Sequence, residues 1–457
     1  MAIYSTIFFS LYRFYESTLR GRDTFDHYDF LQKSQWYPRD QVLEIQFAEL
    51  KKLLQHAYDQ VPFYRRIFED KGLVPEDIKT MADYRQLPCI DKDHFRAHKD
   101  EMIARDHLGK TMPKATGGST GQPLQFEYTR TSYEWRVAAR MRGYEWAYCR
   151  DGEKVGHIWG TAIGTPPLSQ RMKEGLHNLF LRRKYFNAFL FSDETIEQVC
   201  RELRKFAPEV VVGYARPLYN LAVSVRDRGI RPPKLRSVIT AADKMQDYQR
   251  EVIEEVFGCE VFNTYGSREF MLIGSECEEH TGLHINAENI VAEIVHDDEL
   301  FEPGGPGELV ITDLHNYGMP FIRYKIGDLG VPSEEQSCPC GRGLPLIKDV
   351  EGRLLDMIIT RDGRMVPGVF FPHLAKEFVE IKQLQVVQND LDSLLIKIVQ
   401  AQDFKGASLD RFKEEVENVV GKGIRFDIEF VDQIPVTATG KLRVTISNVL
   451  VEGRSQE

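Results

Sequence analysis

The feature that most constrains the fold is an alternation of amphipathic helical segments with short apolar runs in the middle of the chain. Ile196, Val199 and Leu203 recur at helical spacing, which predicts a helix that Ser192 can cap. The strand-like run 210–212 follows, and further strands and helices alternate after it. Helices that alternate with short buried strands are typical of a parallel sheet covered on both faces. The sequence therefore predicts an α/β fold.

Composition and charge exclude several classes of protein. The 457 residues carry 59 basic and 69 acidic side chains, a net charge of -10, whereas general nucleic-acid binders show a basic surplus. No apolar run reaches the roughly 18 residues of a membrane span, and a polar interruption at 12–16 disfavours a signal peptide. Seven cysteines, an odd number, fit reduced thiols in a chain of this length. We expect a cytoplasmic, multidomain protein; a homodimer is left open.

Changes of pattern along the chain suggest two domains. Residues 1 to about 110 predict helices, and the segment from about 283 to 331 predicts strands with turns. The last hundred residues predict a small α+β unit with a capped helix over 408–421. We therefore expect a large N-terminal domain over 1–352 and a small C-terminal domain over 353–457.

A loop rich in glycine and hydroxyl groups is the sharpest local feature. It comprises Thr116, Gly117, Gly118, Ser119, Thr120, Gly121, Gln122 and Pro123. Its backbone N–H groups can face an anion, although it lacks the Lys-Ser/Thr pair of a Walker A loop. It also matches G-x-S-x-G, but the alternating segment 124–128 predicts a strand after the loop, where a nucleophile elbow requires a helix. A plain surface turn is the remaining alternative.

Three further segments carry residue types suited to nucleotide chemistry. After a short strand, Tyr265 offers a flat face to a base and Glu269 offers a carboxylate to a divalent cation. Asp328 follows Gly327 and is either a turn residue or a partner for a ribose diol, because a carboxylate accepts two O–H donors. Lys441 ends a Thr-Gly-Lys loop, where a solvated lysine is the ordinary alternative.

In this order the segments resemble the adenylate-forming superfamily of acyl-CoA synthetases, peptide-synthetase adenylation domains and luciferases. The resemblance is strongest to phenylacetate–CoA ligase and its relatives from capsular polysaccharide gene clusters. It covers the helix 53–65, the glycine loop, the segment 208–214, the Tyr-Gly-Ser-Arg-Glu segment, the Gly327-Asp328 turn, Gly352-Arg353 and the Thr439-Gly440-Lys441 loop. It implies a large N-terminal domain of α/β subdomains with a β-rich segment, followed by a small mobile α+β C-terminal domain.

The resemblance implies how ATP would be held. The loop from Thr116 to Gly121 would wrap the phosphates. Ala242 and Asp243 would border the adenine. Tyr265, followed by Gly266, would stack on the same base.

The resemblance also implies the groups around the reacting phosphate. Ser267 would contact the α-phosphate region and Glu269 would bind Mg²⁺. Asp328 would hold the ribose hydroxyls, with Arg353 nearby. Lys441 would reach from the C-terminal domain to the substrate carboxylate and the α-phosphate, where negative charge develops during the reaction.

Together these roles imply an ATP-dependent, AMP-forming carboxylic acid ligase that transfers the acyl group to CoA. Three departures from the family pattern stand out. Gln122 stands where the phosphate loop usually has a lysine. Two departures bear on the acceptor: Leu354 and Leu355 precede Asp356 where the hinge usually has a charged residue, and the segment 361–367 matches only loosely the loop that completes the thioester half-reaction. The alternative is therefore a ligase that transfers the acid to an amine, an amino acid or a sugar. A non-catalytic scaffold is disfavoured because Glu269, Asp328 and Lys441 are all present.

The residues do not identify the carboxylic acid substrate. Aromatic side chains such as Tyr144, Trp159 and Tyr214 would suit an aromatic acid, although aromatic residues more often pack a core. The basic run 182–184 could attract an acidic or sugar-phosphate substrate, although such a run is more often a solvated face.

A metal site is expected around a C-x-C turn. Cys338 and Cys340 can offer two thiolates to one ion, and Cys277 with His284 could complete a tetrahedral Cys₃His zinc site. The resemblance supports it, because phenylacetate–CoA ligase-like proteins carry such residues at matching places. His280 competes as the nitrogen ligand, and reduced thiols without metal are the alternative. Zinc would have a structural role.

Overall fold

The computed structural model describes residues 2–115, 124–159, 168–187, 195–242, 244–296, 299–300, 306–353, 357–361, 365–367, 370–375, 378, 381–400, 409–421, 423–435 and 443–449. The chain divides into two compact units. The first comprises Met1–Ile326 and Gly330–Val350, and the second comprises Gly327–Leu329 and Glu351–Glu457.

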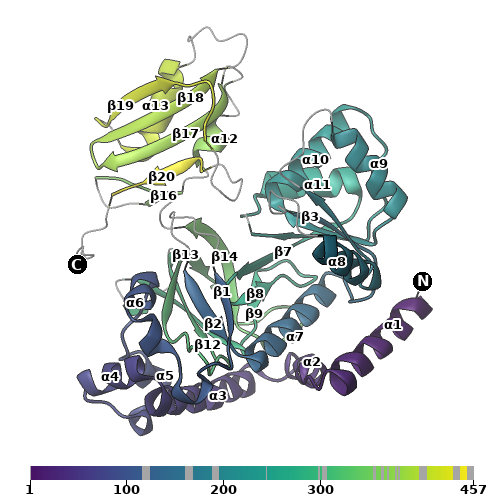
Figure 1. Cartoon of the computed structure of the whole chain (residues 1–457). Coiled ribbons are helices and arrows are strands. Elements are labelled where there is room, and N and C mark those ends of the chain that lie inside the picture. Colours follow the sequence, from purple (N-terminus) through teal and green to yellow (C-terminus); the bar gives the residue numbers. More distant parts are fainter. Residues whose placement is uncertain are drawn as a thin grey trace. The chain divides into compact units, whose positions relative to one another are not determined.

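Helices dominate the start of the first unit (Figure 1). They are α1 (Ala2–Phe14), a π-helix (Tyr15–Leu19), α2 (Thr24–Ser34), α3 (Arg39–Gln60), α4 (Pro62–Asp70), α5 (Met81–Tyr84) and α6 (Lys92–Ala97), with short 3₁₀ turns at Pro75–Asp77, Lys99–Met102 and Arg105–His107. Pro62 lies in the first turn of α4. Proline lacks an N–H and so cannot continue a helix, but it is favourable in the first turn of the next one, which explains why α3 ends here.

A large mixed sheet forms the centre of the first unit. Its strands are β3 (Val155–Trp159), β4 (Arg183–Asn187), β5 (Val210–Tyr214), β6 (Ser237–Ala241), β7 (Glu260–Ser267), β8 (Met271–Ser275), β9 (Leu283–Ile285), β10 (Ile290–His296), β11 (Glu299–Leu300), β12 (Gly307–Asp313), β13 (Tyr324–Pro332) and β14 (Leu346–Arg353). Within the described residues their order is β11-β10-β12-β13-β14-β9-β8-β7-β6-β5-β3-β4. The remaining helices of this unit are α7 (Arg130–Trp146), α8 (Leu168–Phe180), α9 (Ile196–Phe206), α10 (Ala215–Asp227) and α11 (Asp247–Phe257).

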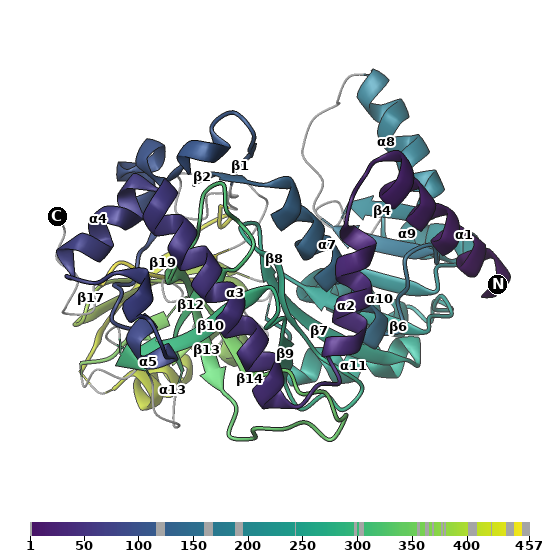
Figure 2. The same cartoon turned by 90° about the horizontal axis from the view of Figure 1, so that it is seen from below.

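The half of the sheet formed by β4, β3, β5, β6 and β7 is parallel and is covered on both faces. Val211, Val238 and Val261 point to one face and pack in a core with residues of α9, α10 and α11. Their neighbours Val212 and Ile239 point to the other face, toward the end of α7. Figures 1 and 2 show these helices on the two sides of the strands. Because successive side chains alternate between faces, burial of both faces explains the uninterrupted apolar runs of the sequence.

From β7 onward the sheet is antiparallel or mixed. The pair β10–β12 is a long antiparallel ladder from Ile290↔Asp313 to Val295↔Glu308. Its apolar side chains share one core with α3 and α4, to which Leu50, Leu53 and Phe68 contribute fully buried side chains. A separate hairpin, β1 (Met112–Ala115) with β2 (Gln125–Tyr128), is antiparallel.

The second unit is a small α+β structure with its own core. Its sheet has the order β19-β18-β17-β20 within the described residues, and a two-stranded sheet pairs β15 with β16. The elements are β15 (Met357–Ile359), β16 (Met365–Pro367), α12 (Phe370–Ala375), β17 (Ile381–Asp390), β18 (Ser393–Gln400), α13 (Leu409–Val420), β19 (Arg425–Phe430) and β20 (Thr445–Ser447). Phe412 and Val416 of α13 are fully buried against Val386 and Ile396 of the sheet.

The expected fold class is confirmed. The parallel α/β centre, the β-rich segment after it and the α+β unit at the end are all present. One detail differs: α9 begins at Ile196 with Thr195 at its N-cap. Ser192, the expected cap, lies outside the described residues. No helix in the described part of the chain is both long enough and apolar enough to cross a lipid bilayer.

Candidate active site and metal site

The carboxyl ends of β6 and β7 carry several of the residues expected to bind nucleotide. The two strands are parallel and in register from Ser237↔Glu260 to Thr240↔Asn263, so both end at the same edge of the sheet. In open α/β sheets, ligands bind outside this edge. Ala242, just after β6, has a φ of 67°, a left-handed conformation that is costly for a residue with a Cβ and is often found at functional sites. Asp243 lies outside the described residues.

The turn from β7 into β8 is shaped by one glycine. The ladder between the strands is irregular between Tyr265 and Gly266. A Cβ placed on Gly266 would lie 1.9 Å from the carbonyl oxygen of Met271, so a larger residue cannot occupy this position without moving the backbone. Ser267 Oγ accepts a hydrogen bond of 3.2 Å from the N–H of Phe270 and thereby closes the turn.

Glu269 lies in this turn and is 5% exposed. Its carboxylate makes no hydrogen bond and no salt bridge to another residue in the described ranges. A buried carboxylate without such a partner is costly unless a cation or another donor compensates its charge. The chemistry of the side chain therefore fits a hard divalent cation, which prefers oxygen ligands.

A lysine that sequence reasoning missed lies next to the glycine loop. Lys114 lies on β1, one residue before the strand ends at Ala115. Its Nζ lies 5.5 Å from the centre of the Tyr128 ring. Burial, together with the charges of Arg136 and Arg268, lowers the pKa of Lys114 to about 8, and the charge of Glu269 opposes this change. Gln122 replaces the lysine that this loop usually carries. Lys114, two residues before Thr116, supplies a positively charged side chain at the start of the same loop.

The hairpin decides against a nucleophile elbow at Ser119. β1 and β2 pair in register from Met112↔Tyr128 to Ala115↔Gln125, so a strand follows the loop as predicted. The loop residues Thr116, Gly117, Gly118, Ser119, Thr120 and Gly121 lie outside the described residues.

The remaining expected site residues are distributed between the two units. Asp328 lies on β13 and is half-buried, and Arg353 is the last residue of β14; both belong to the second unit. Lys441 lies outside the described residues. The first unit thus holds Ala242 and the turn 265–269 at one sheet edge, and the nucleotide-binding roles of all these residues stay predictions.

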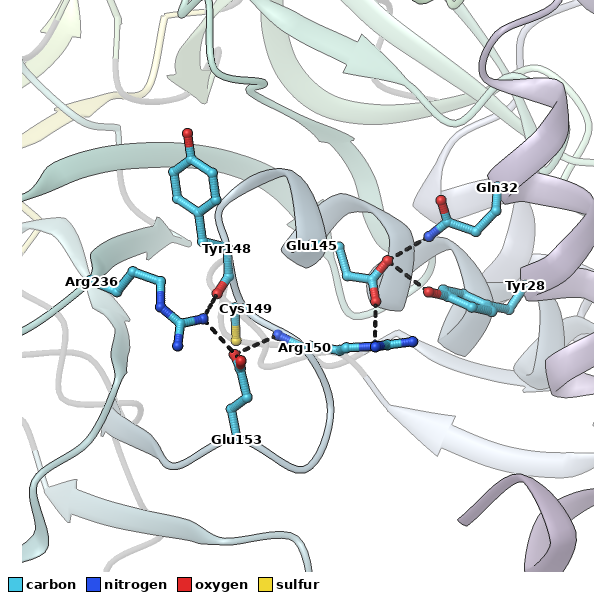
Figure 3. Close-up of a pocket in the computed structure, with 8 residues that line it drawn as sticks. All are labelled: Tyr28, Gln32, Glu145, Tyr148, Cys149, Arg150, Glu153 and Arg236. Atoms are coloured by element: carbon cyan, nitrogen blue, oxygen red, sulfur yellow. Dashed lines mark hydrogen bonds and ion pairs between the residues drawn. The ribbon is translucent and has the colours of Figure 1, made fainter. Parts of the chain in front are cut away.

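A hollow of about 460 Å³ opens at the opposite, amino-terminal edge of the parallel strands (Figure 3). Its charged side chains neutralise one another. Glu145 accepts a hydrogen bond of 2.6 Å from Tyr28 and forms a salt bridge of 3.2 Å with Arg150, while Arg236 donates to Glu153 at 2.9 Å. This mutual pairing, on the edge away from the strand ends, is typical of a structural surface feature.

Three cysteines and one histidine converge where β8, β9 and β14 begin or end. Their ligand atoms all lie within 4.8 Å of one another. The Sγ atoms of Cys277 and Cys338 are 3.6 Å apart, and Cys340 Sγ is 3.4 Å from His284 Nε2. Zn–S bonds of about 2.3 Å and Zn–N bonds of about 2.0 Å give tetrahedral edges of roughly 3.5–3.8 Å. These two separations are close to such edges, and the Cys277–Cys338 distance is far too long for a disulfide bond of about 2.05 Å.

The structure also distinguishes the two candidate histidines. His284 lies on β9 and is fully buried, and burial together with Arg342 lowers its pKa to about 4, so its ring is the neutral form that binds metal. His280 instead faces Glu276, at 3.2 Å from its Nδ1. Gly341, with a φ of 82°, allows the tight turn that brings Cys338 and Cys340 to the same point.

Comparisons with known proteins agree with this architecture. The family model of the CapK C-terminal domain matches residues 358–448. The chain is 28% identical over 415 residues to Protein CapK of Staphylococcus aureus, covering 89% of this chain and 90% of that protein. It is 26% identical over 443 residues to phenylacetate-coenzyme A ligase of Thermus thermophilus, covering 89% and 96%.

The fold is similar to that of a solved ligase. The structure of 2-hydroxyisobutyryl-CoA ligase in the postadenylation state matches with a TM-score of 0.70 and 20% identity, covering 91% of this chain and 92% of that one. The expected resemblance is confirmed: the chain is similar to CapK and to phenylacetate-coenzyme A ligases over most of its length, and it shares the fold of 2-hydroxyisobutyryl-CoA ligase.

Proposed function

We propose that the protein is an ATP-dependent, AMP-forming carboxylic acid ligase that makes an acyl-adenylate and transfers the acyl group to CoA. One observation carries the proposal: the similarity to phenylacetate-coenzyme A ligase extends over 89% of this chain and 96% of that enzyme. The similarity therefore extends into both units of the chain.

In the first half-reaction, an oxygen of the substrate carboxylate attacks the α-phosphorus of ATP. A P–O bond forms, the bond to pyrophosphate breaks, and the acid becomes a mixed anhydride. We assign ATP to the edge formed by Ala242 and Tyr265, with the glycine loop 116–121 around the phosphates. Ser267 and Lys441 would lie at the α-phosphate, where they stabilise the charge that develops on its oxygens. Asp328 would accept hydrogen bonds from the ribose.

Glu269 would hold Mg²⁺, which when bound shields the charge of the phosphate oxygens. The support lies in this chain: a buried carboxylate that forms no hydrogen bond and no salt bridge with a described residue. Besides Mg²⁺, Lys114 would supply a positive charge at the start of the glycine loop 116–121. In the second half-reaction the sulfur of CoA attacks the acyl carbonyl, a thioester forms and AMP leaves. A protein that uses ATP, Mg²⁺ and CoA would work in the cytoplasm.

We also propose that Cys277, His284, Cys338 and Cys340 hold a structural zinc ion. The support is the chemistry and spacing of the four ligand atoms, all within 4.8 Å. Four protein ligands leave no open position, which is the arrangement of structural rather than catalytic zinc.

A second candidate acceptor is an amine, in capsular polysaccharide biosynthesis. The observations that favour it are the match of residues 358–448 to the CapK C-terminal domain and the similarity to Protein CapK over 89% of this chain. With an amine, the adenylation step is the same and the product is an amide.

The test of adenylation is ATP–pyrophosphate exchange with a panel of carboxylic acids. Exchange that depends on one class of acid is expected, and exchange with none of them would contradict the proposal. The acceptor is then identified by leaving out one candidate at a time. AMP release that depends on CoA supports a thioester-forming ligase. AMP release with amino acids or amino sugars and without CoA supports the amide-forming alternative.

A further inference from the structure

A cavity of about 240 Å³ lies between α7 and the strands β3 and β4. Its lining includes His157 and Trp159 of β3, Arg183 and Tyr185 of β4, and Arg140 of α7. Every second residue of each strand takes part, as expected for one face of a sheet. This is the face opposite to the one on which Ile158 packs with α9 and α10.

The cavity extends along the strands from their carboxyl ends. Val155 pairs with Arg183, and Trp159 pairs with Asn187, so Arg183 and Trp159 mark the two ends of the β3–β4 ladder. Four residues at about 3.3 Å each separate them by roughly 13 Å. At the carboxyl end the Trp159 ring lies 4.4 Å from the ring of Tyr214, at the end of β5. This is the sheet edge at which β6 and β7 carry the candidate active site.

Two arginines meet one carboxylate at the far end. Arg140 donates to both oxygens of Asp151, at 3.2 and 2.7 Å, and Arg183 donates one hydrogen bond to it at 3.1 Å. Burial alone would raise the pKa of Asp151, but the two arginines lower it to about 2, so its charge is permanent near neutral pH. Two positive charges thus face one negative charge.

Among the described residues that line the cavity, no other group cancels the excess positive charge. Burial, with help from Arg183 and Arg140, lowers the pKa of His157 to about 3, so this ring is neutral. Burial raises the pKa of Cys149 and of Tyr144 to about 12, and both stay protonated. Tyr12, which Asp151 and Arg140 also influence, has a pKa raised to about 12 by burial.

Donors remain available inside the cavity. Among the described residues, Asp151 is the one hydrogen-bond acceptor for the Arg183 side chain, whose guanidinium carries five N–H donors. His157 stacks on Tyr185 with 4.6 Å between ring centres, and its Nε2 has no partner in the described part of the chain. A buried site with net positive charge and unused donors is arranged for an anion.

We propose that this cavity is a subsite for a second anionic group of the acid substrate, so that the substrate class is a flat acid with a carboxylate at each end. The inference rests on the proposed function, because the first carboxylate is the one that would be adenylated at the edge of β6 and β7. The rings of Tyr144, Trp159 and Tyr185 line the cavity and suit the aromatic ring of such a substrate. A long apolar chain fits less well, since it would leave the excess positive charge of Arg140 and Arg183 over Asp151 uncompensated and His157 Nε2 without a partner.

The basic run 182–184 provides a matched pair of variants. Arg183 points into the cavity, whereas Lys184, one residue later, points to the other face and pairs with Glu202 at 2.9 Å. Arg183→Gln and Lys184→Gln therefore remove the same charge from the same strand, and only the first removes it from the cavity.

The experiment measures equilibrium binding to the full chain by calorimetry. The probes are 3-(4-carboxyphenyl)propanoate and 3-phenylpropanoate, which differ only in the distal carboxylate. The dicarboxylate is expected to bind more tightly by about 10- to 100-fold, the range of a charged hydrogen bond. Arg183→Gln should abolish that preference, Lys184→Gln should keep it, and Arg183→Lys should restore part of it. His157→Phe, which keeps the stacking on Tyr185, should weaken dicarboxylate binding if Arg183→Gln does not fold.

The outcomes separate this inference from the proposed function. Equal affinity for the two probes, or an equal effect of Arg183→Gln and Lys184→Gln, would overturn the subsite even if the enzyme adenylates other acids. Selective binding of the dicarboxylate without pyrophosphate exchange would support the subsite and contradict the ligase.

Discussion

At the scale of single residues, Glu269 leads to a specific prediction about Mg²⁺ binding. Its carboxylate is buried at the β7–β8 turn without a hydrogen-bond or salt-bridge partner among the described residues. If it binds Mg²⁺, Glu269→Gln keeps the shape of the side chain and removes the charge that the cation needs. We expect kcat/KM for ATP in pyrophosphate exchange to fall by roughly 100-fold, as for loss of one transition-state contact. Raising the Mg²⁺ concentration should recover part of the loss.

The control for this variant is Glu279→Gln, which removes the same charge from an exposed position nearby. It should leave exchange unchanged. Parent-like activity of Glu269→Gln at low Mg²⁺ concentration would show that another group holds the cation.

Lys114 leads to a prediction about pH. Burial is the main cause that lowers its pKa to about 8 in the folded protein, whereas the unfolded chain has the ordinary value near 10.5. Below pH 8 both states are protonated, and the folded state bears the cost of the buried charge. As pH rises from 8 toward 10.5, the folded state loses this proton first and the cost disappears, so the contribution of Lys114 to stability becomes less unfavourable.

Lys114→Gln should therefore raise the free energy of unfolding relative to the parent at pH 7, and the difference should shrink by pH 10. Urea unfolding of the two proteins at pH 7, 8, 9 and 10 measures this. Lys184→Gln, which loses an exposed salt bridge, serves as the comparison. A parent–variant difference that does not depend on pH would mean that the Lys114 pKa is not lowered.

At the scale of elements, the cysteine cluster connects segments that are distant in sequence. Cys277 follows β8, His284 lies on β9, and Cys338 and Cys340 precede β14. His284 of β9 pairs with Ser275 of β8 on one side and with Leu346 of β14 on the other. An ion bound here would therefore join three segments of one sheet. Binding free energy at such a site adds to the free energy of folding.

We expect about one zinc ion per chain in protein purified without chelator. Cys338→Ser should lower the zinc content to near zero and the Tm by several degrees. Cys259→Ser, a change at a half-buried cysteine outside the cluster, should alter neither. Metal analysis that finds no zinc in the parent protein would contradict the site.

At the scale of the whole molecule, the two half-reactions should need different positions of the segment after Gly352. With the proposed role of Lys441, the first half-reaction would need this lysine at the α-phosphate, and the second would need it withdrawn so that the acceptor can enter. A hinge at Leu354–Asp356 would allow this change, since hinges are a few residues that absorb large dihedral changes. We expect Leu355→Pro to restrict the hinge and to slow acyl transfer more than adenylation, and Lys441→Ala to slow adenylation by roughly 100-fold or more.

The measurement is the pair of rates, pyrophosphate exchange and product release to the acceptor, for both variants and the parent. Leu355→Pro should lower the second rate selectively, whereas Lys441→Ala should lower the first. If Leu355→Pro reduced the two rates equally, or neither, the pivot would lie elsewhere. Parent-like exchange in Lys441→Ala would remove that lysine from the adenylation step.

The sequence by itself determined the fold class and the order of the segments. Continuous apolar runs such as 210–212 predicted buried parallel strands, because a strand covered on both faces needs apolar residues on each. The segment 124–128 predicted a strand from its alternation alone. These are local patterns, and secondary structure of this kind depends on local periodicity.

Only the tertiary structure decided which distant residues meet. His284 rather than His280 lies with the cysteines, although only four residues separate them, because β9 directs His284 to the cluster while a turn directs His280 to Glu276. Arg140, Asp151 and Arg183 come from a helix, a loop and a strand, and nothing in their spacing predicts one cavity. The basic run 182–184 looked like a single solvated face. The alternation of a strand sends Arg183 inward and Lys184 outward, and that orientation exists only once β4 has paired with β3.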